Sequence, residues 1–188
     1  MPRLQNPEVK LAQAKSMDNR QERITLLSRM NRGRLETPSR LIAISKALGV
    51  PVDARALLPL PDSDTLMNSF RAGYQAAKPP SAYRRFFLRR DELSAFKLAD
   101  CLAERLSEDV YFLTKKGENC GALRVSMTDL LKHAKSVIHL DGDSLSAASP
   151  DGVEGLLIDY NPDDDQQTYQ VAVWGNRWPV HALECDPH

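Results

Sequence analysis

The chain has 188 residues, which fits one ordinary domain or a small module joined to a domain of about 100 residues. Its 42% hydrophobic and 27% charged residues are typical of a globular protein, and no apolar run approaches the ~18 residues of a membrane helix. The start lacks the apolar core of a signal peptide, and three cysteines without a Cys-x-x-Cys pair argue against a disulfide framework or a zinc knuckle. We therefore expect a cytoplasmic protein without membrane contact, metal or cofactor.

The formal net charge of zero hides an uneven distribution of charge along the chain. Residues 1–80 contain 13 Lys/Arg and 7 Asp/Glu, so their net charge is 13 − 7 = +6, whereas residues 81–188 contain 12 and 18, which gives −6. A basic N-terminal part indicates a polyanionic partner, and an acidic C-terminal part does not.

The N-terminal part, 1–58, is predicted to be a small all-helical module. The pattern in 23–33 predicts a first helix that ends at Gly33 and buries three apolar residues at helical spacing, Ile24, Leu27 and Met30. A second helix is predicted from an N-cap at Ser39 to a C′ glycine at Gly49, with one apolar face formed by Leu41, Ile44 and Leu48. A short turn or helix follows Asp53.

Prolines divide the rest of the chain. Two proline-bearing stretches, 58–64 and 76–82, predict a linker over 59–82 that includes at most a short helix. Residues 83–188 then form an acidic domain. Strands are predicted at 83–90, 109–114, 122–125, 136–140, 155–160, 168–175 and 177–183, with helices at 91–108 and 127–135. The fold class is therefore α+β, with a largely antiparallel sheet.

The stretch "LSRMNRGRLETPSRLIAISKALGVPVDARALL" (27–58) resembles the second half of the lambda-repressor-like, or Cro/CI-type, helix-turn-helix domain. The segment 27–33 resembles the end of that family's recognition helix, and "ISKALGV" (44–50) resembles the helix that follows. The resemblance implies binding of duplex DNA by side chains that reach bases or phosphates from this helix. These side chains are Arg23, Thr25, Ser28, Arg29, Arg32 and Arg34.

The stretch "DGDSLSAASPDG" (141–152) contains a serine with competing interpretations. A GDSL-type esterase is rejected because only 44 residues follow Ser144, and an EF-hand-type calcium loop is rejected because its later oxygen ligands are missing. An ordinary turn-rich connection before a strand is the simplest interpretation.

Residues 137–183 also resemble the C-terminal domain of S24-type, or LexA-like, repressors. In that family a serine after an apolar strand is activated by a later lysine. Here Ser144 would be the nucleophile, and His181, 181 − 144 = 37 residues later, occupies the lysine position. The missing lysine implies a version of the domain that does not cleave itself and serves dimerisation or partner binding.

The acidic C-terminal domain also has features of a protein-binding surface. Carboxylates can steer a basic partner, and tryptophan is common in binding hot spots. The candidate contact residues are Asp141, Asp143, Trp174 and Trp178.

Three functional hypotheses follow from these patterns. The first is a DNA-binding transcriptional regulator of phage-repressor type that is not an enzyme, with a non-catalytic C-terminal domain that forms a homodimer or binds a partner. The alternative is an inhibitor or immunity-type protein that neutralises a basic partner such as a toxin. The third is a self-cleaving S24-type repressor.

Overall fold

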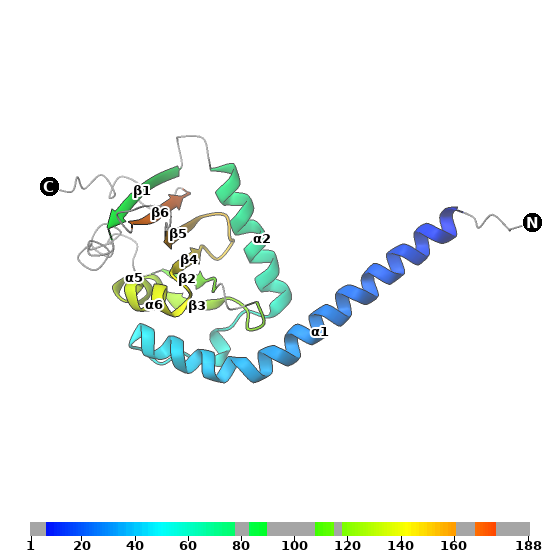
Figure 1. Ribbon diagram of the computed structural model, residues 1–188, viewed down its shortest axis with the longest axis horizontal. Coiled ribbons are helices and arrows are strands. Elements are labelled where there is room, and N and C mark those ends of the chain that lie inside the picture. The colour runs from blue at the N-terminus through cyan, green and yellow to red at the C-terminus, as the bar shows by residue number, and fades with distance from the viewer. Residues whose placement is uncertain (1–6, 78–82, 90–107, 115–117, 161–167, 176–188) are drawn as a thin grey trace, which may run out of the picture.

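The computed structural model describes residues 7–77, 83–89, 108–114, 118–160 and 168–175, and side chains within these ranges from residue 19 onwards, except in 83–89. The protein is α+β, as the sequence predicts: a helical N-terminal region precedes an antiparallel sheet with helices (Figure 1). The predicted strand at 177–183 and all but the last residue of the predicted helix at 91–108 lie outside the described residues.

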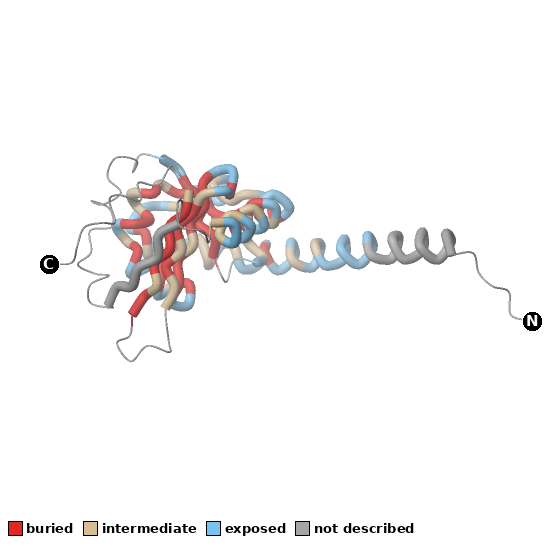
Figure 2. The backbone as a smooth tube through the Cα atoms, turned by 90° about the horizontal axis from the view of Figure 1, so that it is seen from above, coloured by how far each residue is buried: buried red, intermediate tan, exposed pale blue. Residues whose placement is uncertain are grey.

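A single helix, α1 (Pro7–Leu48), forms most of the N-terminal region. Its 42 residues correspond to a rod of ~63 Å, and its first half projects beyond the rest of the molecule (Figures 1 and 2). The prediction of two helices in 23–49 is therefore wrong, because the helix continues through Gly33. Ser39 is not an N-cap, since its hydroxyl donates to the carbonyl of Glu36 within the helix at 2.9 Å. The helix-turn-helix resemblance itself stays a prediction.

The end of α1 agrees with its sequence. Ile44 and Leu48 are buried in the main core, Leu41 packs against that core, and Gly49 ends the helix with a φ of 68°. Asp53 then caps a short 3₁₀ helix, η1 (Ala54–Ala56), by accepting a hydrogen bond from the backbone N–H of Arg55 at 2.7 Å.

The predicted linker contains instead a second long helix, α2 (Leu60–Ala76). Pro59 is its N-cap residue and Pro61 lies in its first turn, where a missing N–H costs nothing. The prolines therefore begin this helix rather than break it. Leu66 and Phe70 are buried against the sheet, so α2 belongs to the folded domain.

Six strands form one antiparallel sheet in the described residues, in the order β1-β6-β5-β4-β2-β3. Five of them fall where the sequence predicts strands: β1 (Tyr83–Arg89), β2 (Asp109–Phe112), β3 (Leu123–Ser126), β5 (Gly155–Tyr160) and β6 (Thr168–Trp174). Strand β3 leads directly into α5 (Met127–Lys132), whose N-cap is Ser126, as predicted.

Two predictions for the segment before β5 are wrong. Residues 136–140 are not a strand but part of α6 (Ala134–Leu140), because Ala134, Val137 and Ile138 lie on one side of a helix and are buried together. The next strand, β4 (Ser144–Ala148), replaces the predicted loop. Its small side chains suit a central strand that is covered on both faces.

The two faces of the sheet carry separate cores. In β5, Leu156 and Ile158 point to the core beneath α5, α6 and the end of α1, while Leu157 points to the core beneath α2. The second core centres on Trp174, whose ring packs edge-on against Phe70 at 4.8 Å. The end of α1 and the whole of α2 are thus tied to opposite faces of one sheet.

The fold predicts a specific role for Gly33. A Cβ atom at this position would lie 2.0 Å from the carbonyl oxygen of Asn119, so only glycine allows the helix to approach that turn. We expect Gly33→Ala to lower the free energy of unfolding by roughly 1–3 kcal/mol, although alanine is the better helix former by about 1 kcal/mol. Urea denaturation of both proteins measures the difference.

Ser28→Ala, at an exposed position on the same helix, serves as the control and should leave the unfolding midpoint nearly unchanged. A Gly33→Ala variant as stable as the control would show that the helix does not rest on this turn.

Candidate functional site

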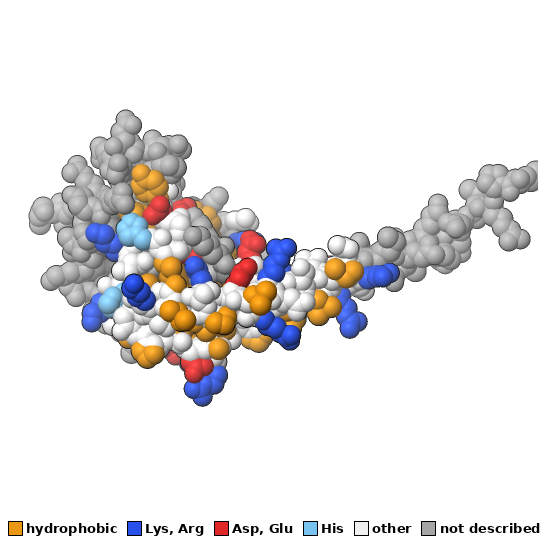
Figure 3. Space-filling model, turned by 60° about the horizontal axis from the view of Figure 1, so that its bottom comes forward, with side chains coloured by type: hydrophobic (Ala, Val, Ile, Leu, Met, Phe, Trp, Pro, Cys, Tyr) orange, Lys and Arg blue, Asp and Glu red, His pale blue; other side chains and the backbone are white. Residues whose placement is uncertain are grey.

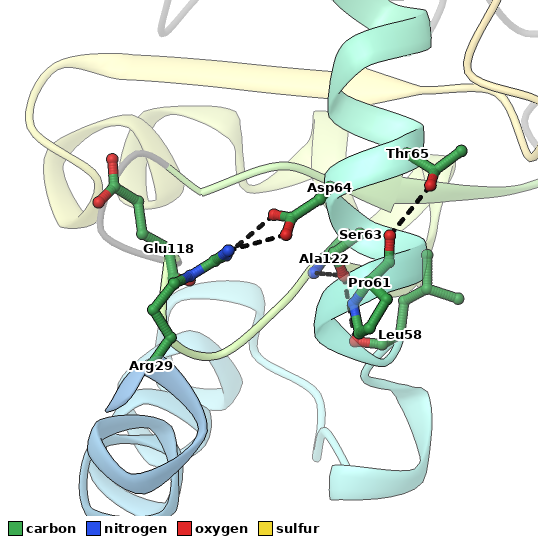
Figure 4. Close-up of polar contacts among 8 residues, drawn as sticks. All are labelled: Arg29, Leu58, Pro61, Ser63, Asp64, Thr65, Glu118 and Ala122. Atoms are coloured by element: carbon green, nitrogen blue, oxygen red, sulfur yellow. Dashed lines mark hydrogen bonds and ion pairs between the residues drawn. The ribbon is translucent and has the colours of Figure 1, made fainter. Parts of the chain in front are cut away.

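Arg29 of α1 makes several polar contacts and reaches across to α2 (Figure 4). Its guanidinium forms a two-pronged ion pair with the carboxylate of Asp64, at 2.7 and 2.9 Å. It also donates to the carbonyl oxygen of Glu118, at 2.8 Å from Nε and 2.6 Å from Nη2. The hydrogen bond with Asp64 raises the pKa of Arg29 above its ordinary value, so the guanidinium stays protonated over the physiological range.

The turn that Arg29 contacts, residues 118–121, is held from the α1 side at two further points. The carbonyl of Asn119 lies against Gly33, and the side-chain amide of Asn119 donates to the carboxylate of Glu36 at 3.1 Å. Arg29, Gly33 and Glu36 are three or four residues apart, so they share one side of α1. We call residues 118–121 the clamped turn.

Helix α2 holds the same turn from its other side. The hydroxyl of Ser63 accepts from the N–H of Ala122 at 2.8 Å and donates to the carbonyl of Leu58 at 3.1 Å (Figure 4). The N–H of Leu58 donates in turn to the carbonyl of Ala122 at 2.8 Å. Gly121, with a φ of 85°, leaves no space for a side chain between these groups. The turn therefore fixes α1 relative to α2.

Nearer its end, α1 is joined by a buried ion pair to Asp141, the C-cap residue of α6. Arg40 Nη2 lies 2.5 Å from the carboxylate of Asp141, whose side chain is fully buried. Burial of two charges is costly unless they pair, so this contact fixes the position of the helix even where its net contribution to stability is small.

A cavity of about 490 Å³ opens beside the Arg29–Asp64 pair. It lies between α2, the end of β2 and the clamped turn. Its walls combine apolar and polar side chains, among them Met67, Asn68, Arg71, Leu113 and Thr114. On the other side of the pair, α1 and the start of α2 border an open depression of about 530 Å³.

The side of α1 that faces away from these contacts is exposed. It carries apolar and basic residues at spacings of three and four, which place them on one side of the helix. We call this set the outer face: Arg20, Arg23, Ile24, Leu27, Met30 and Arg34, all exposed. The three apolar side chains are 41–51% exposed, so the prediction that they are buried is wrong. Figure 3 shows hydrophobic and basic side chains interleaved along this helix.

The residues predicted to contact DNA are divided between these surfaces. Four of them are exposed on α1: Arg23, Ser28, Arg32 and Arg34. Thr25 is also exposed, but its hydroxyl donates to the carbonyl of Gln21 at 3.0 Å. Arg29 is engaged by Asp64 and Glu118, so it contributes to the position of the helix rather than to its outer face.

Ser144 begins β4 and is fully buried, rather than part of a surface loop. Within the described parts of the chain its hydroxyl has no hydrogen-bond partner. The predicted base, His181, lies outside the described residues. The self-cleaving hypothesis therefore stays a prediction, and the described residues supply no group that would activate this serine.

The predicted acidic and aromatic contact residues are largely unavailable to a partner. Asp141 is buried against Arg40, and Trp174 is buried with its indole N–H donating to the carbonyl of Val153 at 3.0 Å. Asp143 is exposed, with a φ of 63°, whereas Trp178 lies outside the described residues.

Comparisons with models of protein families, with curated proteins and with solved structures give no significant match to this chain. Across the described ranges, no helix has the length and apolar character needed to cross a membrane. The same ranges contain no cluster of three or more His, Cys, Asp or Glu side chains suited to a metal ion.

The Arg29–Asp64 pair can be tested through Asp64→Asn, which removes the charge and one prong of the contact. Hydrogen bonds to charged groups contribute about 1.5–3 kcal/mol, and the 46% exposure of the Asp64 side chain reduces this by solvent screening. We expect a loss of about 1 kcal/mol in the free energy of unfolding, measured by urea denaturation.

Asp62→Asn is the matched control, because Asp62 is an exposed carboxylate in the first turn of the same helix. Equal losses for the two variants would mean that a general charge effect, and not the pair with Arg29, is responsible.

Proposed function

We propose that this protein binds another protein through the outer face of α1. The observation that supports the proposal most strongly is the exposure of Ile24, Leu27 and Met30 at regular spacing on a helix that projects from the sheet (Figure 2). Single exposed apolar residues are ordinary on protein surfaces, but a row of them along one helix is typical of a binding face.

The charges on the outer face define the chemistry of the partner. Arg20, Arg23 and Arg34 flank the apolar row, and the carboxylate of Glu22 lies on a different side of the helix. Arginine and methionine are enriched at protein interfaces, and a helix with apolar anchors at such spacing fits a hydrophobic groove. The complementary partner surface is an apolar groove whose rim carries carboxylates.

This proposal modifies the inhibitor hypothesis drawn from the sequence. That hypothesis placed the contact on an acidic face with Asp141 and Trp174, and both side chains are buried. The outer face of α1 is basic instead, so it favours an acidic partner over a basic one.

DNA binding is the second candidate function, supported by the arginines alone. Arg23, Arg32 and Arg34 are exposed on a single helix, and a helix of this diameter fits the major groove. Phosphates, however, attract cations, and contact with them would not bury the apolar side chains of Ile24 and Leu27. The apolar row therefore favours a protein partner.

The proposal predicts that charges placed in the apolar row abolish binding. In the full-length protein, Ile24→Asp together with Leu27→Asp removes two apolar anchors and introduces repulsion towards a carboxylate-lined groove. Each anchor contributes about 1.5–3 kcal/mol on full burial, so the affinity should fall by at least about a hundredfold. Stability should be unchanged, because neither side chain packs against the domain.

The measurement combines affinity capture from cell extract with direct titration of each captured protein in purified form. Gln21→Asp together with Thr25→Asp is the control, since it adds the same charge on another side of the helix and should retain binding. Identical affinity for wild type and the Ile24/Leu27 variant would contradict the proposal. Binding to random duplex DNA that weakens steeply with salt and survives the Ile24/Leu27 substitutions would favour the second candidate.

A further inference from the structure

The exposed apolar residues of α1 continue beyond the outer face, into the part of the helix that is held by the domain. Leu35 and Ile42 have the two most exposed large hydrophobic side chains among the described residues, at 83% and 72%. They belong to a set of exposed residues that follow one another at steps of three or four and therefore share one side of the helix. We call this set the extended row: Ile24, Leu27, Asn31, Leu35, Pro38 and Ile42. It runs for about 27 Å along α1.

The extended row lies on the side of α1 that faces away from the domain. It is about half a turn around the helix from Gly33, which contacts the clamped turn, and from Ile44, which is buried in the main core. Figure 1 shows that α1 bends around the domain, so its outward side is the convex one. Pro38 lies on this side, and a proline within a helix favours such a bend because its ring displaces a carbonyl of the preceding turn. A partner that contacts the whole row must therefore be concave.

The exposed charges around the extended row are positive. Between residues 19 and 48 the helix has two carboxylates, and both are on the side towards the domain. Glu22 borders the depression between α1 and α2, and Glu36 accepts a hydrogen bond from Asn119. The exposed cations near the row are Arg20, Arg23, Arg32, Arg34 and Lys46. A surface that is complementary to the row must carry carboxylates beside its apolar centre.

A second copy of this chain does not provide such a surface along α1. Two parallel copies of the row would place each arginine beside its own counterpart, and two antiparallel copies would bring Arg20 and Arg23 close to Lys46. Like charges across a pair of helices are destabilising, and charges that flank an apolar row select the partner. The charges therefore favour a different protein over a second copy.

We propose that the partner is a different protein with a concave, apolar cleft lined by carboxylates, and that this cleft contacts α1 from Ile24 to Ile42, on both sides of the bend. The inference rests on the proposed function and extends its surface to Leu35 and Ile42. Because the domain already holds this part of the helix, these two anchors lose little conformational entropy on binding. Asn31, in the middle of the row, requires a polar group of the cleft opposite it.

Photo-cross-linking of the full-length protein, in the cells that produce it, is the first part of the test. Benzoylphenylalanine replaces Ile24, Leu35 or Ile42, one at a time, and mass spectrometry identifies the peptide attached at each position. We expect the same partner protein at all three positions, with Asp and Glu outnumbering Lys and Arg in the attached peptides. Attachment of positions 35 and 42 to a second copy of this chain, or to peptides with an excess of Lys and Arg, overturns the inference.

Titration of the purified partner against variants is the second part. Leu35→Asp together with Ile42→Asp should lower the affinity at least about a hundredfold, because two apolar anchors are lost and two negative charges face carboxylates. Ser39→Asp together with Ala43→Asp is the control. It adds the same charge to the same part of α1, on another side of the helix, and should change the affinity by no more than about fivefold. Circular dichroism verifies that each variant is folded.

The outcomes separate this inference from the proposed function. Unchanged affinity in the Leu35/Ile42 variant, with affinity lost in the Ile24/Leu27 variant, overturns the inference and leaves the proposed function standing. Unchanged affinity in both variants, or no attached protein at any of the three positions, overturns both. Vesicles of phosphatidylcholine and phosphatidylserine, at roughly 3:1, represent the other anionic surface that such a helix can contact. Binding to them that is lost in the Leu35/Ile42 variant, without any attached protein, assigns the row to a lipid surface and also overturns the inference.

Discussion

The clamped turn, residues 118–121, is the contact on which the arrangement of this protein depends. Arg29 and Gly33 contact it from α1, and Ser63 of α2 accepts a hydrogen bond from the N–H of Ala122, the residue that follows it. Without these contacts α1 would be tied to the sheet only through its last turns, and its direction would be free to vary. With them, a helix of 42 residues leaves the domain at a fixed angle.

The clamped turn divides α1 into two parts, of which only the second is stabilised by contacts with the domain. Beyond Arg29 the helix is supported by the turn, by the buried Arg40–Asp141 pair and by burial of Ile44 and Leu48. From Asn19 to Ser28 its side chains are largely exposed (Figure 2). A helical segment of about 20 residues is only marginally stable alone in water, so the projecting part gains most from a partner that covers it. The packed second part of α1 thus supports a projecting first part, whose side chains make few contacts with the domain.

The sequence correctly predicted the elements that are marked by local patterns, such as helix caps and regularly spaced apolar residues. The Leu41–Ile44–Leu48 spacing, the glycine at 49 and the Ser126 cap were all confirmed, as were the strands with long buried apolar runs. Gly33 was misread because a glycine that ends a helix and one that permits close packing look the same in sequence. Residues 136–140 were misread because β-branched residues favour strands, and burial against the end of α1 overrides that preference.

The candidate sites were less predictable, because they depend on contacts between distant residues. Arg29 meets Asp64 and Glu118 at separations of 35 and 89 residues, and no local pattern marks such a pair. Of the four arginines that were expected to be available to a partner, Arg23, Arg32 and Arg34 are exposed, and Arg29 instead makes contacts within the protein that only the fold reveals.

Amide hydrogen exchange along α1 in the full-length protein tests most directly whether the clamped turn stabilises the second part of this helix. The account predicts that amides from Gly33 to Leu48 are protected to nearly the same degree as those of β5, while amides before Thr25 exchange at least about a hundredfold faster. Protection that is already lost between Gly33 and Arg40, or that extends undiminished to the residues before Thr25, would contradict it.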